Sequence, residues 1–394
     1  MGTPAESTAA NQAAMRAMAA GDFAGAEGLL VQGLSRDRGN LAAWLNLAIV
    51  RRQRQNVGGA FEALREVLTI DGRNFRALLM SASMLEQIEH TKQAATAYGI
   101  ALANTPPDEA LDAPTRAAVQ HGREVQAKYA NDLGDYLRSA AADTRGQCSP
   151  PERRRLDRFI DITLRVKPRY PQLPLEYYYP GLPPIEFYER EDFPWLEEFE
   201  AQTPAIQREL HAILAEDAGA FNPYIHYGDH LPLDQWRELN NSPKWTAYHF
   251  YEQGRRVEER CRRAPLTIAA VEALPQAGVP LRSPTALFSV LQPKTHIPPH
   301  TGVANFRLLV HLPLILPGNC RFRVGSETRQ WGLGEAWVFD DTIEHEAWND
   351  SDETRVILIC DIWNPWLSPE ERHAIAAVIA ATDAYNGTVP AAHV

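Results

Sequence analysis

Alanine residues recur every 34 positions through the first hundred residues of this chain. One series comprises Ala14, Ala48 and Ala82, and a second comprises Ala26, Ala60 and Ala94. A period of this length is typical of solenoids built from helical hairpins, in which small residues let paired helices pack closely. We therefore predict an N-terminal α-solenoid over residues 7–145. An unrelated helical bundle is the alternative, which the agreement in register across successive repeats disfavours.

The repeating stretch also carries large residues at fixed positions after the second alanine series. It resembles tetratricopeptide repeats (TPRs), whose consensus positions are matched in one repeat by Trp44, Leu47, Ala48, Ala60 and Leu64, and in the latter half of the next by Ala94, Tyr98 and Pro106. The resemblance implies a surface that binds a protein partner through the repeats.

A connecting segment, 146–200, is expected after the solenoid. A helix should run from Pro114 to about Ala141 and be broken by Gly146, Pro150 and Pro151, and a further amphipathic stretch follows. Prolines and aromatic residues then alternate from Pro168 to Pro194. A disordered linker is one interpretation of that stretch, but its many aromatic residues favour an extended segment packed on a domain.

Strand signals dominate from Ala286 onward. Short β-rich runs lie at Ala286–Leu291, Phe306–Leu316, Cys320–Val324, Ala336–Phe339 and Thr354–Trp363, separated by Gly and Pro turns. This spacing predicts a sandwich or jelly roll over residues 201–385. The predicted fold class is therefore multidomain α+β, with a TPR-like α-solenoid followed by a double-stranded β-helix (jelly roll). A last helix should begin after Ser368, with Glu371 completing a capping box.

Composition excludes several partner classes. The 50 acidic residues outnumber the 39 Lys and Arg, giving a net charge of −11. Such a chain is a poor non-specific binder of nucleic acid or of a membrane surface. No apolar run approaches the roughly 18–20 residues of a membrane span. The four cysteines show no CxxC spacing, so we expect isolated reduced thiols and a cytoplasmic location.

Two histidines and an arginine form the main candidate site. His300 lies in a turn that should lead into a strand, and Arg355 comes ten residues after His345, on the last predicted strand. In jelly-roll oxygenases, two histidines from separate strands hold Fe(II), and open positions accept 2-oxoglutarate and O₂. A basic residue on a later strand then binds the distal carboxylate of 2-oxoglutarate. An isolated histidine in a strand is more often structural, but this order of residues within a jelly-roll pattern favours the metal site.

The stretch from about Trp245 to Pro369 resembles the aspartyl/asparaginyl β-hydroxylase family of Fe(II)- and 2-oxoglutarate-dependent oxygenases. The matching motifs are Gln253-Gly254-Arg255-Arg256, His300-Thr301-Gly302, Asn305 with Arg307 and His311, Phe339-Asp340-Asp341 with Glu344-His345-Glu346 and Trp348, and Asp361-Ile362-Trp363 with Pro365. Animal members also place the oxygenase after a TPR region, so the domain order agrees.

The resemblance assigns roles to individual residues. His300 and His345 would bind Fe(II), and Arg355 and Ser289 would hold the C5 carboxylate of 2-oxoglutarate. His311 would lie near this co-substrate, and Tyr251 would line the active site where the animal enzymes have Trp. Gln253 and Arg307 match positions that face the peptide substrate. His300, His345 and Arg355 are thus the catalytic candidates.

Three positions depart from the expected pattern. Gly302 stands where most 2-oxoglutarate oxygenases place the third, carboxylate ligand, which agrees with a family that works with two protein ligands. The gap would admit water or chloride, so halogenation is a minor alternative. Leu309 and Leu287 replace an Arg and a Lys of the animal hydroxylases.

A pair at His226 and His230 is a weaker metal candidate, because Gly228 favours a loop there.

The predicted function is Fe(II)/2-oxoglutarate-dependent hydroxylation of an unactivated C–H bond, the β-carbon of an Asp- or Asn-type residue being the leading choice. The substrate would be a peptide, a protein or a related small molecule. The alternative from another class is a non-catalytic TPR adaptor whose jelly roll only binds a ligand.

Overall fold

A computed structural model describes residues 4–228 and 232–387 of the chain. The chain divides into two compact units, Met1–Val166 and Lys167–Val394, and each is considered by itself. The segment predicted to connect the domains, 146–200, is shared between them, its helix in the first unit and its Pro- and aromatic-rich stretch in the second. No helix within 4–228 and 232–387 has both the length and the apolar character needed to cross a membrane.

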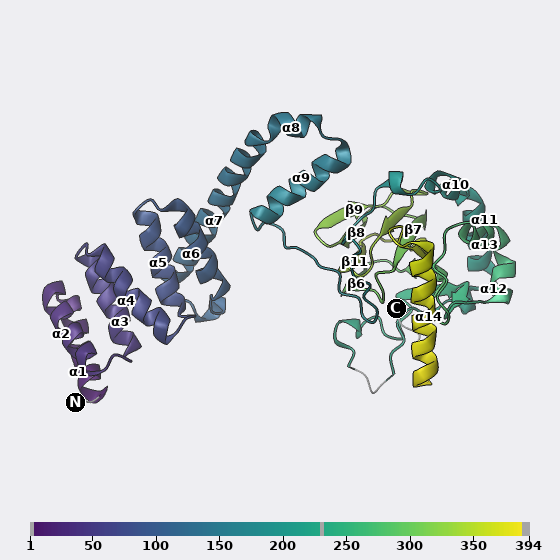
Figure 1. Cartoon of the computed structure of the whole chain (residues 1–394). Helices are drawn as coiled ribbons and strands as arrows, with labels where there is room; N and C mark the ends of the chain where they lie inside the picture. The colour runs from purple at the N-terminus through teal and green to yellow at the C-terminus, as the bar shows by residue number, and fades with distance from the viewer. Residues whose placement is uncertain (1–3, 229–231, 388–394) are drawn as a thin grey trace. The chain divides into compact units, whose positions relative to one another are not determined.

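The first unit is a stack of helical hairpins (Figure 1). Its helices are α1 (Pro4–Ala19), α2 (Phe23–Arg36), α3 (Leu41–Gln53), α4 (Val57–Ile70), α5 (Phe75–Gln87), α6 (Thr91–Ala103), α7 (Ala113–Ala140), α8 (Ala142–Gln147) and α9 (Pro150–Thr163). Both alanine series are fully buried where paired helices meet. Asn40, Asn56 and Asn74 cap successive helices by accepting a hydrogen bond from a first-turn backbone amide. The prediction of a TPR-like solenoid is confirmed.

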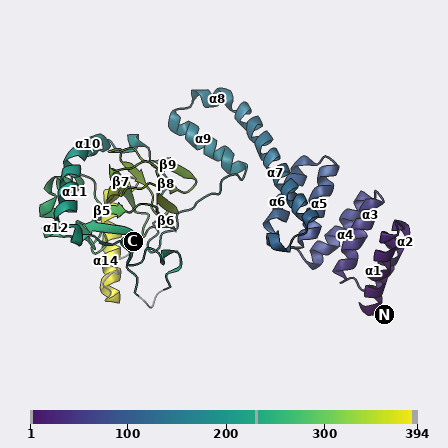
Figure 2. The same cartoon turned by 180° about the vertical axis from the view of Figure 1, so that it is seen from behind.

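Two antiparallel sheets form the centre of the second unit (Figure 2). The six-stranded sheet has the order β1 (Asn222–Pro223), β2 (Trp245–His249), β5 (Ala286–Leu291), β12 (Arg355–Trp363), β7 (Arg307–Ile315) and β10 (Trp337–Phe339). The four-stranded sheet has the order β6 (Thr295–His300), β11 (His345–Asn349), β8 (Cys320–Val324) and β9 (Glu327–Gln330). A separate ribbon pairs β3 (Tyr251–Glu252) with β4 (Arg255–Arg256). The predicted β domain is therefore present, as two antiparallel sheets.

The two faces of the six-stranded sheet have different roles. On the outer face, side chains such as Phe288, Val310 and Leu358 pack against helices. These helices are α10 (Leu196–Ala201), α11 (Thr203–Glu216), α12 (Glu258–Arg263) and α13 (Pro265–Glu272). Because side chains alternate along a strand, Ser289 and His311 point to the opposite face, toward the four-stranded sheet. The last helix, α14 (Pro369–Asn386), begins with the predicted capping box between Ser368 and Glu371.

Strand β6 corrects one expectation from the sequence. We predicted that His300 lies in a turn before a strand, whereas the structure places it at the end of β6. Pro298 and Pro299 lack the N–H group that a central strand needs, and they suggested a turn. Strand β6 is an edge strand of its sheet, so one of its sides needs no ladder partner and the prolines are tolerated.

The Pro- and aromatic-rich stretch runs as an extended strap along the second unit. Isolated bridges pair Gln172 with Ile343 and Tyr177 with Ala304. The backbone N–H of Leu173 donates to the carbonyl of Thr342 at 2.7 Å, and that of Leu175 donates to the carbonyl of Gly302 at 2.9 Å. The strap thus binds the two loops that adjoin His300 and His345.

Candidate active site

A cavity lies between the two sheets of the second unit. Its lining includes six of the residues predicted for the site: Ser289, His300, Arg307, His311, His345 and Arg355. They come from strands β5, β6, β7, β11 and β12, which are far apart in the sequence. The fold therefore brings most of the predicted site together, while the roles of the residues stay predictions.

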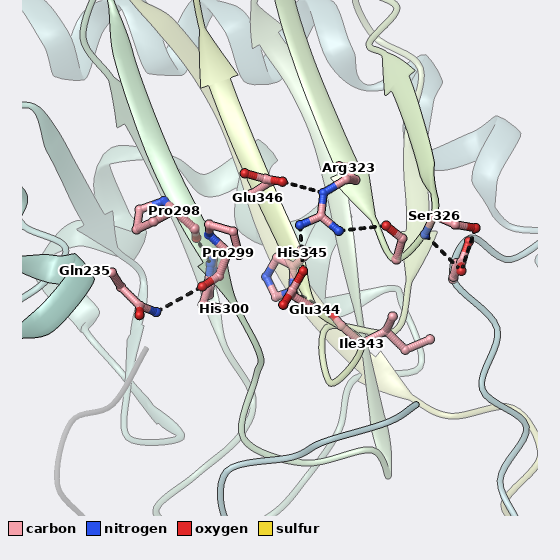
Figure 3. Close-up of polar contacts among 12 residues, drawn as sticks. Gln235, Pro298, Pro299, His300, Arg323, Ser326, Ile343, Glu344, His345 and Glu346 are labelled. Carbon is pink, nitrogen blue, oxygen red and sulfur yellow. Dashed lines mark hydrogen bonds and ion pairs between the residues drawn. The ribbon is translucent and has the colours of Figure 1, made fainter. Parts of the chain in front are cut away.

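His300 and His345 are register partners on neighbouring strands (Figure 3). Their ring centroids lie 4.1 Å apart. The Nδ1 atom of His300 lies 2.8 Å from the carbonyl oxygen of Pro298, and that of His345 lies 3.0 Å from the carbonyl oxygen of Ile343. Since a carbonyl only accepts, each Nδ1 must carry the proton, which leaves each Nε2 lone pair able to coordinate a metal.

Burial favours the neutral form of both histidines. Burial lowers the pKa of His345 to about 4, and burial together with neighbouring His345 lowers the pKa of His300 well below its ordinary value. Neutral imidazoles with an oriented Nε2 suit a divalent first-row metal such as Fe(II). No cluster of three or more potential His, Cys, Asp or Glu ligands occurs within 4–228 and 232–387, so the protein would supply a pair of ligands.

Asp341 explains why position 302 holds glycine. A Cβ atom at Gly302 would overlap the carboxylate of Asp341. The carboxylate has little freedom to move, because its Oδ2 lies 3.2 Å from Arg307 and its side chain is buried. A side chain at position 302 would have to displace this carboxylate, which agrees with a site of two protein ligands.

Substituting Gly302 tests this packing. We expect Gly302→Ala to lower the free energy of unfolding by about 1–3 kcal/mol, because Asp341 must be displaced. Gly302→Asp carries the same clash, so we expect it to bring no gain in metal affinity. Urea unfolding and Mn(II) titration measure the two effects. Gly318→Ala is the matched control, because a Cβ at Gly318 would meet no atom within 4 Å. Tighter Mn(II) binding by Gly302→Asp would contradict the proposed packing.

Arg355 lines the same cavity as the two histidines. It is only 1% exposed, its Nε atom has no hydrogen-bond partner, and no acidic group within the described chain forms an ion pair with it. Burial lowers the pKa of this guanidinium to about 10. The Nδ1 atom of buried His311 also lacks a partner among the described residues. Ser289 lies beside them and its Oγ accepts a bond of 3.0 Å from Trp245, leaving its hydroxyl hydrogen to donate. These groups together fit a carboxylate.

Two predicted residues are not brought to the cavity. Tyr251 packs in the core beside the covering helices, and its hydroxyl donates to Glu272 at 2.7 Å. Gln253 lies in the turn of the β3–β4 ribbon, where its backbone has a φ of 50°. The resemblance aligned these positions with active-site residues, but neither belongs to the lining of the cavity.

Sequence reasoning did not identify the aromatic wall of the cavity. Tyr224 stacks on Trp245 with ring centroids 4.0 Å apart, and both line the cavity. The β-strand pattern around Trp245 could have suggested an inward side chain, but Tyr224 lies in a stretch with no repeating signal. The weaker metal candidate stays a prediction: His226 lies beside Asn241, and His230 lies outside the described residues.

Ionic contacts around the metal candidates hold the strand that carries His345. Arg323 on β8 forms ion pairs with Glu344 and Glu346, which flank His345, and donates to the carbonyl of Gly325 at 2.7 Å (Figure 3). On the other side, Gln235 donates to the carbonyl of Pro299 at 3.0 Å. The backbone around both histidines is therefore anchored before any ligand binds.

Partial burial of His249 on β2 leads to a pH prediction. Burial lowers its pKa from 6.5 to about 4, so between these pH values the unfolded chain binds a proton that the folded chain does not. The free energy of unfolding therefore falls as the pH drops through this window, by up to about 1.4 kcal/mol per pH unit. Because His249→Gln cannot take up this proton, we expect its stability relative to wild type to rise by up to about 3 kcal/mol from pH 7 to pH 4.

Urea unfolding of both proteins at a series of pH values measures the difference in their free energies of unfolding. The other titrating groups are the same in both proteins, so their contributions cancel in this difference. His211→Gln serves as the control, because His211 is an exposed residue on α11. A stability difference between wild type and His249→Gln that does not change with pH would contradict the prediction.

Comparison with known proteins agrees with this geometry. Residues 200–365 match the family profile described as aspartyl/asparaginyl β-hydroxylase. The human protein of that name is 38% identical over 149 residues, which cover 38% of this chain and 19% of the human protein. An ornithine lipid ester-linked acyl 2-hydroxylase from Rhizobium tropici is 34% identical over 205 residues, covering 50% of this chain and 66% of that protein. The chain thus spans about a fifth of the length of the human and mouse hydroxylases.

Several solved structures that match about a third of this chain are TPR domains. The Sgt2 TPR domain from Aspergillus fumigatus has 20% identity and a TM-score of 0.28, with 34% of this chain and 83% of that chain covered. The first TPR domain of human RPAP3 has 12% identity and a TM-score of 0.29, with 33% and 98% covered. Residues 200–365 form an aspartyl/asparaginyl β-hydroxylase domain, which this chain joins to an N-terminal TPR-like region.

Proposed function

We propose that the chain is an Fe(II)- and 2-oxoglutarate-dependent dioxygenase that hydroxylates an unactivated C–H bond. The observation that carries the proposal is that one cavity joins a pair of neutral, oriented histidines to a buried arginine without an acidic partner among the described residues. Membership of the family implies the same cofactor and co-substrate.

Each group of residues has a distinct part in this proposal. His300 and His345 would hold Fe(II) through Nε2, and Arg355 with Ser289 would hold the C5 carboxylate of 2-oxoglutarate. The bound metal and co-substrate supply the oxidation: one oxygen atom of O₂ enters succinate as CO₂ leaves, and the other enters the C–H bond as a hydroxyl. The stacked Tyr224 and Trp245 would exclude water from the cavity.

The substrate classes follow from the names of the relatives. The human hydroxylase suggests the β-carbon of an Asp or Asn residue in a peptide or protein, and the Rhizobium protein suggests an acyl chain. Halogenation is disfavoured, because a chloride beside Gly302 would face the carboxylate of Asp341.

The test uses the full chain with Fe(II), 2-oxoglutarate and candidate substrates. We expect substrate-dependent succinate formation and a product heavier by one oxygen atom in mass spectrometry. Isothermal titration of 2-oxoglutarate into Mn(II)-loaded protein provides a readout that needs no turnover. A non-catalytic adaptor would bind no 2-oxoglutarate in a metal-dependent manner, and that result would overturn the proposal.

The remaining proposals concern the partner and the compartment. The TPR-like region would bind a protein partner, as the names of similar TPR structures indicate for those proteins. The cytoplasm is the proposed location, supported by four cysteines that are all free thiols.

A further inference from the structure

The charge of Arg307 is already balanced inside the protein. Its guanidinium lies 3.2 Å from Oδ2 of Asp341 and 3.7 Å from Oδ2 of Asp361. Asp361 is fully buried and also accepts hydrogen bonds from the hydroxyl of Ser283 at 2.6 Å and the backbone N–H of Thr285 at 2.8 Å. Because two buried carboxylates already face this guanidinium, Arg307 offers little attraction to a further anion.

An aliphatic wall lies between Arg307 and Arg355 on the six-stranded sheet. We define it as Leu287, Leu309, Ile357 and Ile359, which belong to one apolar cluster on the inner face of the six-stranded sheet. The register places Ile359 between Leu287 on β5 and His311 on β7. Leu309, Ile357 and Ile359 line the cavity, so its surface between the two arginines is apolar.

The charges that line the cavity limit what can bind in it. Arg307 and Arg355 are its cationic side chains within the described part of the chain. Under the proposed function, Arg355 is occupied by the co-substrate. A carboxylate on the reacting part of a substrate would then have only Arg307, and it would approach Asp341 as a like charge. Uncharged groups meet no such repulsion and gain contact with the aliphatic wall.

We propose that the group presented to His300 and His345 is an uncharged aliphatic segment, which packs on the aliphatic wall, and not an aspartate side chain. The inference rests on the proposed function and narrows its substrate class. The shared chemistry is a chain of methylene or methyl groups, which an acyl chain or an aliphatic amino-acid side chain can supply.

The experiment compares matched probes on the full chain with Fe(II) and 2-oxoglutarate. One host peptide carries Asp, Asn or Leu at a single position, and N-decanoyl glycinamide represents an acyl chain. We expect the Leu peptide or the decanoyl amide to be oxidised with a kcat/KM at least about tenfold above that of the Asp peptide. The two aliphatic arms distinguish a side chain from an acyl chain as the source.

Each contrary outcome has a definite meaning. Preference for the Asp peptide would overturn the inference. Succinate formation that none of the aliphatic probes stimulates would overturn it too, while leaving the oxygenase proposal in place. Failure of Mn(II)-loaded protein to bind 2-oxoglutarate would remove the proposed function itself and, with it, the inference.

A substitution in the aliphatic wall provides a second test. Leu309→Arg places a cation in the aliphatic wall, so we expect it to shift the ratio of Asp-peptide to Leu-peptide oxidation toward Asp by at least about tenfold. Leu309→Met keeps the wall apolar and should leave this ratio unchanged. An unchanged ratio in folded Leu309→Arg would overturn the inference, and the wild-type comparison decides alone if that variant does not fold.

Discussion

Replacing His345 with alanine is expected to reduce substrate-dependent succinate formation by at least about 100-fold, since altering even an outer partner of a metal ligand costs about 10–100-fold in metal affinity or activity. His345 would supply one of a pair of protein ligands, and the described ranges contain no group of three or more potential ligands that could compensate for its loss. His300→Ala should have the same effect for the same reason.

Two measurements separate a metal-binding role from a structural one. Mn(II) titration should show weaker binding by His345→Ala, and circular dichroism should show that the fold is retained. His373→Ala is the control, because His373 is exposed on α14, away from the cavity. Unchanged turnover by His345→Ala would disprove the site assignment.

The parts of the fold that could be predicted from the sequence depend on local signals. The helical hairpins could be predicted from the alanine period, because a small residue is needed wherever two neighbouring helices meet. The capping box at Ser368 and Glu371 marked the start of α14, since its two hydrogen bonds lie within one helical turn. Strands β5 and β8 were predicted with their observed bounds, because Gly and Pro turns delimit them.

The errors arise where tertiary context overrides local preference. The sequence did not predict β6, because prolines such as Pro298 and Pro299 are rare in central strands. They are tolerated here only because β6 lies at the edge of its sheet. Tyr251 was assigned to the cavity by alignment with relatives, but an aligned position does not fix the direction of a side chain. The hydroxyl of Tyr251 bonds Glu272 on α13, a contact that depends on how the helix packs.

The ion pairs that balance the charge of Arg307 could not be predicted from the sequence either. Its carboxylate partners follow it in the sequence by 34 and 54 residues, and they approach it only after β7, β12 and the loop before β11 have assembled. The sequence identified Arg307 as a substrate-facing cation, whereas the structure gives it two buried anionic partners. For Arg355 the reverse holds, because no acid among the described residues pairs with it.

Replacing Arg355 with methionine is therefore expected to change stability and ligand binding in opposite directions. Without ligand, the variant should unfold with a free energy about 1–4 kcal/mol higher than wild type. A buried guanidinium, which stacks on Trp331 but has no acidic partner among the described residues, is replaced by an apolar chain of similar length. Its affinity for 2-oxoglutarate should fall by about 100-fold, the equivalent of two lost charge-assisted hydrogen bonds.

Urea unfolding and calorimetric titration of Mn(II)-loaded protein measure the two quantities. At a 2-oxoglutarate concentration 100 times its Kd, wild type should gain about 2.7 kcal/mol of stability, and the variant almost none. Arg321→Met is the control, because Arg321 is a half-exposed residue that pairs with Asp350 and does not line the cavity. Loss of stability in ligand-free Arg355→Met with unchanged 2-oxoglutarate affinity would mean that Arg355 serves the fold. Higher stability without ligand and weaker 2-oxoglutarate binding are expected together only if the buried guanidinium serves to bind an anion. Its burial then costs the ligand-free protein stability.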